Sequence, residues 1–93
     1  MDDAVIRRYL SAPRAVVLDI IARNPEITHD EIAAYWATHA GPSVPRQGKS
    51  LPQMTGEILW RLVNLEWVEN RRGHFRLTDL GVRVQTVAQS DRC

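Results

Sequence analysis

The chain has a single cysteine, and it is the last residue, Cys93, so no disulfide can form within the chain. It contains no apolar run near the roughly 18 residues that a membrane-spanning helix needs. The first residues, Met1-Asp2-Asp3, are acidic and lack the charged and then apolar order of a signal peptide. We therefore expect a cytoplasmic protein that has no membrane partner.

The chain also has little net charge, because 12 basic residues face 11 acidic ones and the formal total is +1. The charge is unevenly distributed. Residues 1–40 carry four Lys/Arg against six Asp/Glu, a net −2, whereas residues 41–93 carry eight against five, a net +3. Any surface for an acidic partner is therefore expected in the second half of the chain.

No composition bias points to disorder, since 44% of the residues are hydrophobic and 25% are charged. Ninety-three residues are enough for one domain with a modest core. We expect a single domain over residues 1–93. Residues 1–12 would form an N-terminal arm or short helix, and residues 90–93 a polar tail.

Apolar spacing predicts helices at about 13–23, 28–39, 52–66 and 78–89. Thr28 and Glu31 match a capping box at the start of the second of these helices. The helix at 52–66 has a 4-4-3 apolar stripe of Met54, Ile58, Leu62 and Leu65, which Leu59 and Val63 widen. Before it lies a long polar loop, residues 39–50, with two glycines and two prolines.

Two short strands around a basic turn are predicted over residues 67–77. The turn Asn70-Arg71-Arg72-Gly73 suits a β-hairpin, because Asn and Gly tolerate the positive φ angles that such turns need. A third short strand is expected around Glu26-Ile27, paired with the hairpin. The predicted class is therefore α+β and mostly helical. The residues expected to be buried are Val17, Ile20, Ile32, Ile58, Leu62, Leu65, Val68 and Leu77.

The sequence shows no set of residues typical of an enzyme or a metal site. The spacing of His29, His39, His74 and Cys93 fits no compact metal-binding pattern. No glycine-rich phosphate loop and no nucleophile with its base are present. We expect no catalysis, no metal and no cofactor.

A helix followed at once by a basic hairpin is the layout of a winged helix-turn-helix, with a three-helix core, a hairpin wing and a C-terminal helix. From about Ile27 to Gly81 the chain resembles the winged-helix repressors of the MarR and PadR type. The run Leu77-Thr78-Asp79-Leu80-Gly81 matches the family's Leu-Thr-x-x-Gly closely, whereas Leu65-Glu66-Trp67-Val68-Glu69 is a shortened match without the family's glycine. The resemblance implies a DNA-binding regulator whose third helix and wing touch DNA.

The predicted function is therefore sequence-specific binding of double-stranded DNA by a small transcriptional regulator, such as a repressor. Helix 52–66 would enter the major groove, where Arg61 suits guanine and Gln53 or Asn64 suits adenine. The wing, residues 67–77, would lie on the backbone or in the minor groove. The candidate DNA-binding residues are Arg46, Lys49, Gln53, Gly56, Trp60, Arg61, Asn64, Arg71, Arg72, His74 and Arg76.

Two questions stay open at the level of sequence. The alternative function is a winged-helix module for protein–protein interaction, which the low net charge and Glu57 on the reading face favour. A homodimer is expected, because such repressors usually read two half-sites. Its expected surface is the terminal helices, through residues drawn from Val5, Ile6, Tyr9, Val82, Val87 and Ala88.

Overall fold

The computed structural model describes residues 2–39 and 48–90, and within them the chain forms five helices and three short strands. In chain order they are α1 (Asp3–Tyr9), α2 (Ala12–Arg23), β1 (Ile27–Thr28), α3 (His29–His39), α4 (Leu51–Asn64), β2 (Val68–Arg71), β3 (His74–Leu77) and α5 (Asp79–Ser90). The predicted α+β, mostly helical class is confirmed. Arg46, Cys93 and most of the 39–50 loop lie outside the described residues.

All five helices within the described residues begin where a side chain accepts a hydrogen bond from the first turn, and for α5 this is Thr78, which accepts from the Gly81 N–H at 3.0 Å. Asp2 accepts from the Val5 N–H at 3.0 Å, and Ser11 and Ser50 do the same for α2 and α4. Ser11 therefore starts α2 one residue earlier than predicted. The capping box of α3 is confirmed, since the Thr28 N–H donates to Glu31 Oε1 at 3.0 Å and the Glu31 N–H donates to Thr28 Oγ1 at 3.3 Å.

Helix α4 ends at Asn64, two residues before the predicted end at Glu66. Glu66 has a φ of 64°, in the left-handed region. The Trp67 N–H donates to the Leu62 carbonyl at 3.0 Å and the Glu66 N–H to the Val63 carbonyl at 3.0 Å. These two bonds form the usual closure of a helix that ends in a left-handed residue. The closure turns the chain sharply from α4 into β2.

The sheet is antiparallel, with strand order β1-β3-β2. The predicted third strand is confirmed, because Ile27 pairs with Phe75. The turn between β2 and β3 differs from the prediction: the residues with positive φ are Arg72 (53°) and Gly73 (86°), whereas Asn70 stays in the strand. Asn70 instead accepts a hydrogen bond from the Gly73 N–H through Oδ1 at 2.9 Å.

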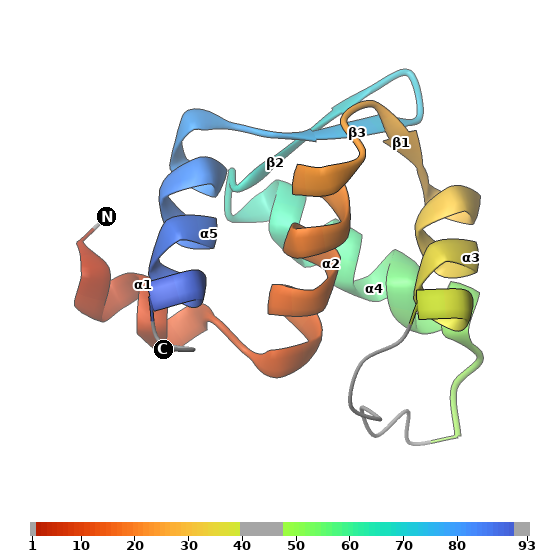
Figure 1. Cartoon of the computed structure of the whole chain (residues 1–93), viewed down its shortest axis with the longest axis horizontal. Helices are drawn as coiled ribbons and strands as arrows, with labels where there is room; N and C mark the ends of the chain where they lie inside the picture. Colours follow the sequence, from red (N-terminus) through yellow and green to blue (C-terminus); the bar gives the residue numbers. More distant parts are fainter. Residues whose placement is uncertain (1, 40–47, 91–93) are drawn as a thin grey trace.

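Helix α2 lies at the centre of the fold (Figure 1), between α5 on one side and α3 on the other. Helix α4 crosses behind α2, the sheet lies across one end, and α1 packs beside α5. Of the residues predicted to be buried, Val17, Ile20, Ile32, Leu62 and Val68 are buried.

The other three predicted core residues, Ile58, Leu65 and Leu77, are only partly buried against that core. The buried line of α4 is Met54, Thr55, Leu59 and Leu62, so the helix is rotated slightly from the predicted 4-4-3 stripe. Val63, which the prediction assigned to the edge of that stripe, is 36% exposed. The rotation brings Leu59 into the core in place of Ile58.

The junction between the hairpin and α5 is built around Trp67, which is fully buried and was not predicted as a core residue. Its carbonyl accepts from the Thr78 N–H at 3.1 Å, and Thr78 Oγ1 donates to the Glu66 carbonyl. Gly81 lies so close that a Cβ there would be 1.9 Å from the Trp67 carbonyl oxygen. The Leu-Thr-x-x-Gly run is therefore a packing junction between the end of α4 and the start of α5.

The terminal helices are packed into the domain rather than left open. Ile6, Val87 and Ala88 are buried within the chain, so the expectation that they form a dimer surface is wrong. Tyr9 and Val82 remain exposed. No helix within residues 2–39 and 48–90 is long and apolar enough to cross a membrane.

Candidate nucleic-acid interface

Helix α4 presents one face to solvent along its whole length. Gln53, Glu57, Trp60 and Asn64 are all exposed, and their 4-3-4 spacing places them in one line along the helix. We call these four residues the α4 line. Arg61 lies on one edge of this line, and Val63 on the opposite edge. The predicted solvent-facing side of this helix therefore carries the expected amides, tryptophan and arginine.

A groove of about 360 Å³ separates α4 from the hairpin. It opens beside the α4 line, on the side of Val63 and away from Arg61. The groove is lined by His29, Gly56, Leu59, Trp60, Val63, Asn64, Asn70 and Phe75. Trp60 is thus shared between the exposed line and the groove, and the hairpin lies on the far side of the groove from Arg61.

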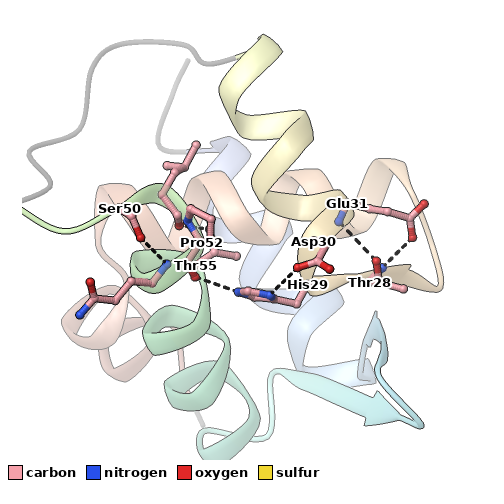
Figure 2. A network of polar contacts seen from close by, with 9 residues as sticks. Thr28, His29, Asp30, Glu31, Ser50, Pro52 and Thr55 are labelled. Atoms are coloured by element: carbon pink, nitrogen blue, oxygen red, sulfur yellow. Dashed lines mark hydrogen bonds and ion pairs between the residues drawn. The ribbon is translucent and has the colours of Figure 1, made fainter.

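The first turn of α4 is held against α3 by polar contacts (Figure 2). His29 Nε2 lies 2.8 Å from the Pro52 carbonyl oxygen, so this nitrogen carries the proton and donates it. His29 Nδ1 lies 3.3 Å from Asp30 Oδ1. A Cβ on Gly56 would lie 3.5 Å from His29 Nε2, which is an ordinary contact. Gly56 therefore faces His29 and the groove, and its expected contact with DNA remains a prediction.

The hairpin carries fewer unpaired charges than its sequence indicates. Glu69 accepts from Arg76 Nε at 2.9 Å and from Arg71 Nε at 3.1 Å, and Arg76 also lies 3.8 Å from Glu26. The hydrogen bond from Arg76 is the main cause that lowers the pKa of the Glu69 carboxyl, and the same pair raises the pKa of Arg76. Glu69 therefore stays ionised and partly neutralises both arginines.

Besides Arg71 and Asn64, three of the predicted site residues have a hydrogen bond or ion pair within the chain. Arg76 is held by Glu69, His74 Nδ1 donates to the Glu26 carbonyl at 2.9 Å, and Lys49 pairs with Glu57 at 2.6 Å. The carbonyl can only accept, so that ring nitrogen of His74 carries a proton. In contrast, Arg72 is exposed at the tip of the turn and has no hydrogen bond or ion pair to residues 2–39 or 48–90.

The predicted site residues therefore fall into two groups on either side of the groove. Gln53, Trp60, Arg61 and Asn64 belong to α4, and Arg71 and Arg72 belong to the hairpin tip. The sequence missed the groove itself and the part that His29, Asn70 and Phe75 take in it. His29 meets the start of α4 across 23 residues of chain, and no local pattern signals such a contact.

No group of three or more His, Cys, Asp or Glu side chains within the described ranges is arranged to hold a metal ion. In comparisons with known proteins, no family model, curated protein or solved structure matches this chain.

Proposed function

We propose that the chain is a winged-helix protein that binds double-stranded DNA and acts as a small transcriptional regulator. Helix α4 would be the reading helix in the major groove, and the β2–β3 hairpin would be the wing on the phosphate backbone. In this proposal α2, α3 and α4 are the three-helix core and α5 is the C-terminal helix. The resemblance of residues 27–81 to MarR and PadR repressors agrees with this assignment.

The observation that carries the proposal is the α4 line with Arg61 at its edge. A helix of 14 residues with one continuous exposed face is long enough to lie across a major groove. Gln53, Asn64 and Arg61 are the side-chain types that read base edges there by hydrogen bonds. Asn64 Nδ2 currently donates to the Trp60 carbonyl at 2.7 Å, so reading adenine requires Asn64 to change rotamer.

Charge assigns different roles to the two groups of residues. Arg61 and Arg72 have no carboxylate partner among the described residues, so both guanidinium groups are available to an anionic ligand. Arg72 at the hairpin tip suits a phosphate, which carries no sequence information. Arg61 on the helix edge suits guanine. Lys49 is a weaker candidate, since it neutralises Glu57 on the reading face.

The test is a salt series on duplex DNA, measured by fluorescence anisotropy, with wild-type protein and three variants. Arg72→Asn removes the charge, and because Asn accepts a positive φ it keeps the turn. Arg61→Gln removes the base-reading guanidinium from an exposed helix position. Arg8→Gln is the matched control, since Arg8 is an exposed arginine on α1, which packs beside α5.

Arg72→Asn should weaken cognate and random duplexes alike and flatten the slope of log affinity against log salt by about 0.9. Arg61→Gln should weaken the cognate site by about 1–3 kcal/mol and relax discrimination there. The Arg8 variant should match wild type. Equal losses for the Arg61 and Arg8 variants on every sequence would remove α4 from the interface.

A second candidate function is a protein–protein interaction module. Two observations favour it: Trp60 and Val63 expose apolar surface on α4, and Glu69 neutralises much of the hairpin's charge. Absence of any salt-dependent DNA affinity at about 50 mM salt would remove the first candidate and leave this one.

We also propose that the regulator acts as a homodimer, since two half-sites supply more specificity than one small domain. Of the apolar residues considered on the terminal helices, Tyr9 and Val82 are the exposed ones that a second copy would cover. Sedimentation of the wild type and a Val82→Glu variant, with and without DNA, tests this. A dimer that survives Val82→Glu would place the interface elsewhere.

A further inference from the structure

Trp60 is the one tryptophan of the three that the fold does not bury. Trp36 and Trp67 are 4% and 0% exposed, whereas Trp60 is 66% exposed at the centre of the α4 line. Val63, on the neighbouring edge of α4, is 36% exposed and lines the same groove. Together Trp60 and Val63 form an apolar strip in the middle of an otherwise polar helix face.

The residues around this strip match a base-pair edge better than an apolar protein surface. Gln53 and Asn64 lie in the same line as Trp60, about two turns and one turn away. Glu57 also lies in this line, and its charge is paired with Lys49. The Arg61 guanidinium carbon lies 5.9 Å from the centre of the Trp60 ring. Across the groove, the hairpin carries Arg72 at its tip. An apolar strip with amides in line and cations beyond it is complementary to bases flanked by phosphates.

We propose that Trp60, supported by Val63, reads thymine through its 5-methyl group; this rests on the proposed function. The thymine methyl is the one apolar group that a base pair presents in the major groove. Indole has a single donor and no acceptor, so it cannot make the paired hydrogen bonds with which an amide or guanidinium reads a base. The apolar edge of the indole packs against the thymine methyl, and cytosine has no methyl with which to make this contact.

The expected effect is set by the size of the group. Burying one methyl-sized apolar group changes affinity about fourfold, which corresponds to about 0.8 kcal/mol. Deoxyuridine differs from thymidine only by this methyl, so the base pair, the phosphates and the groove acceptors all stay the same. The ratio of affinities for thymine and uracil duplexes therefore isolates the proposed contact.

The experiment first selects the tightest-binding duplex from a random pool with wild-type protein. That duplex is then synthesised with deoxyuridine in place of each thymidine in turn, and affinities are measured for wild type, Trp60→Ala and Tyr9→Ala. Because Trp60 is largely exposed, its truncation removes little packing. Tyr9 is the matched control, since it is an exposed aromatic residue on α1, and loss of the dimer contact proposed for it would weaken thymine and uracil duplexes by the same factor.

Wild type and Tyr9→Ala should each lose about fourfold at one or two positions, whereas Trp60→Ala should bind thymine and uracil duplexes equally. Equal binding of both duplexes by wild type, or a selected site without thymine, overturns the inference while DNA binding stands. A thymine preference that Trp60→Ala retains also overturns it, because another residue then reads the methyl. If the pool yields no bound duplex, the proposed function fails and the thymine inference fails with it.

Discussion

Replacing Gly81 with alanine should destabilise the protein, although alanine is the better helix former. Gly81 lies in the first turn of α5, where helix propensity alone would favour alanine by about 1 kcal/mol. However, the added Cβ would lie 1.9 Å from the Trp67 carbonyl oxygen and 2.9 Å from its carbonyl carbon. A carbon and a carbonyl oxygen normally approach to about 3.3 Å, so backbone must move by more than 1 Å.

The magnitude follows from what this movement disrupts. Trp67 is fully buried and cannot shift outward without leaving the core, so forcing α5 away resembles overpacking, at about 1–3 kcal/mol. The hydrogen bond from the Thr78 N–H to the Trp67 carbonyl is lost as well, at about 1 kcal/mol. After subtracting the propensity gain, the expected loss of unfolding free energy is about 2 kcal/mol. For a domain of this size that lowers Tm by about 8–16 °C.

Gly56→Ala is the matched control for this prediction. Gly56 is also a helical glycine, but a Cβ there would meet His29 Nε2 at an ordinary 3.5 Å. The substitution should therefore leave stability unchanged or raise it by up to about 1 kcal/mol. Urea denaturation of both variants, monitored by circular dichroism, measures whether each substitution lowers or raises the free energy of unfolding relative to wild type. A Gly81→Ala protein as stable as Gly56→Ala would refute the close packing of α5 against Trp67.

Three further changes test separate parts of the structure. The hydrogen bond from the Thr28 backbone N–H lowers the pKa of Glu31 below 4.5. The charged carboxylate therefore stabilises the folded state at neutral pH, and this contribution is lost as pH falls through the folded pKa. Denaturation of wild type and Glu31→Gln at several pH values should show a stability difference that shrinks below about pH 4.5. Glu69→Gln should raise the affinity for random DNA by roughly two- to eightfold at 0.1 M salt, because Arg71 and Arg76 lose their carboxylate partner and can contact phosphates. An unchanged affinity in binding titrations would contradict the proposed contact of the hairpin with DNA. Glu66→Gly should raise Tm, because glycine suits the left-handed backbone there and relieves about 1 kcal/mol of strain; a lower Tm would contradict the assigned helix closure.

Most of the fold could be predicted because its signals are local. The capping box of Thr28 and Glu31, the apolar spacing of α2 and α3, and the turn residues of the hairpin each act within a few residues of chain. The third strand at Ile27–Thr28 was also predicted, and its partner in the hairpin is confirmed.

The errors in the prediction have tertiary causes. The rotation of α4, which buries Leu59 instead of Ile58, depends on how the helix packs against α2 and α3. Glu66 takes a left-handed conformation in place of the glycine that a sequence pattern would require, and the burial of Trp67 accompanies it. The helix propensities of the residues cannot show that the burial of Trp67 compensates for the backbone strain at Glu66.

Prediction of the candidate site was limited in a different way. The exposed face of α4 followed from helical spacing, and the residue types on it were read directly from the sequence. The ion pairs of Glu69 with Arg71 and Arg76 could not be read in this way, because they depend on the register of β2 against β3. Counting arginines therefore overstated the positive charge of the hairpin.

The most direct test of the account is the affinity of the wild-type protein for duplex DNA as salt is varied from 0.05 to about 0.3 M. If Arg71 and Arg72 each replace a counterion on a phosphate, the slope of log affinity against log salt should be roughly −1 to −2, at about 0.9 per contact. A selected site should also bind more tightly than random sequence at every salt concentration. No binding at 0.05 M salt, or a slope near zero, would contradict the proposal that α4 and the hairpin bind DNA.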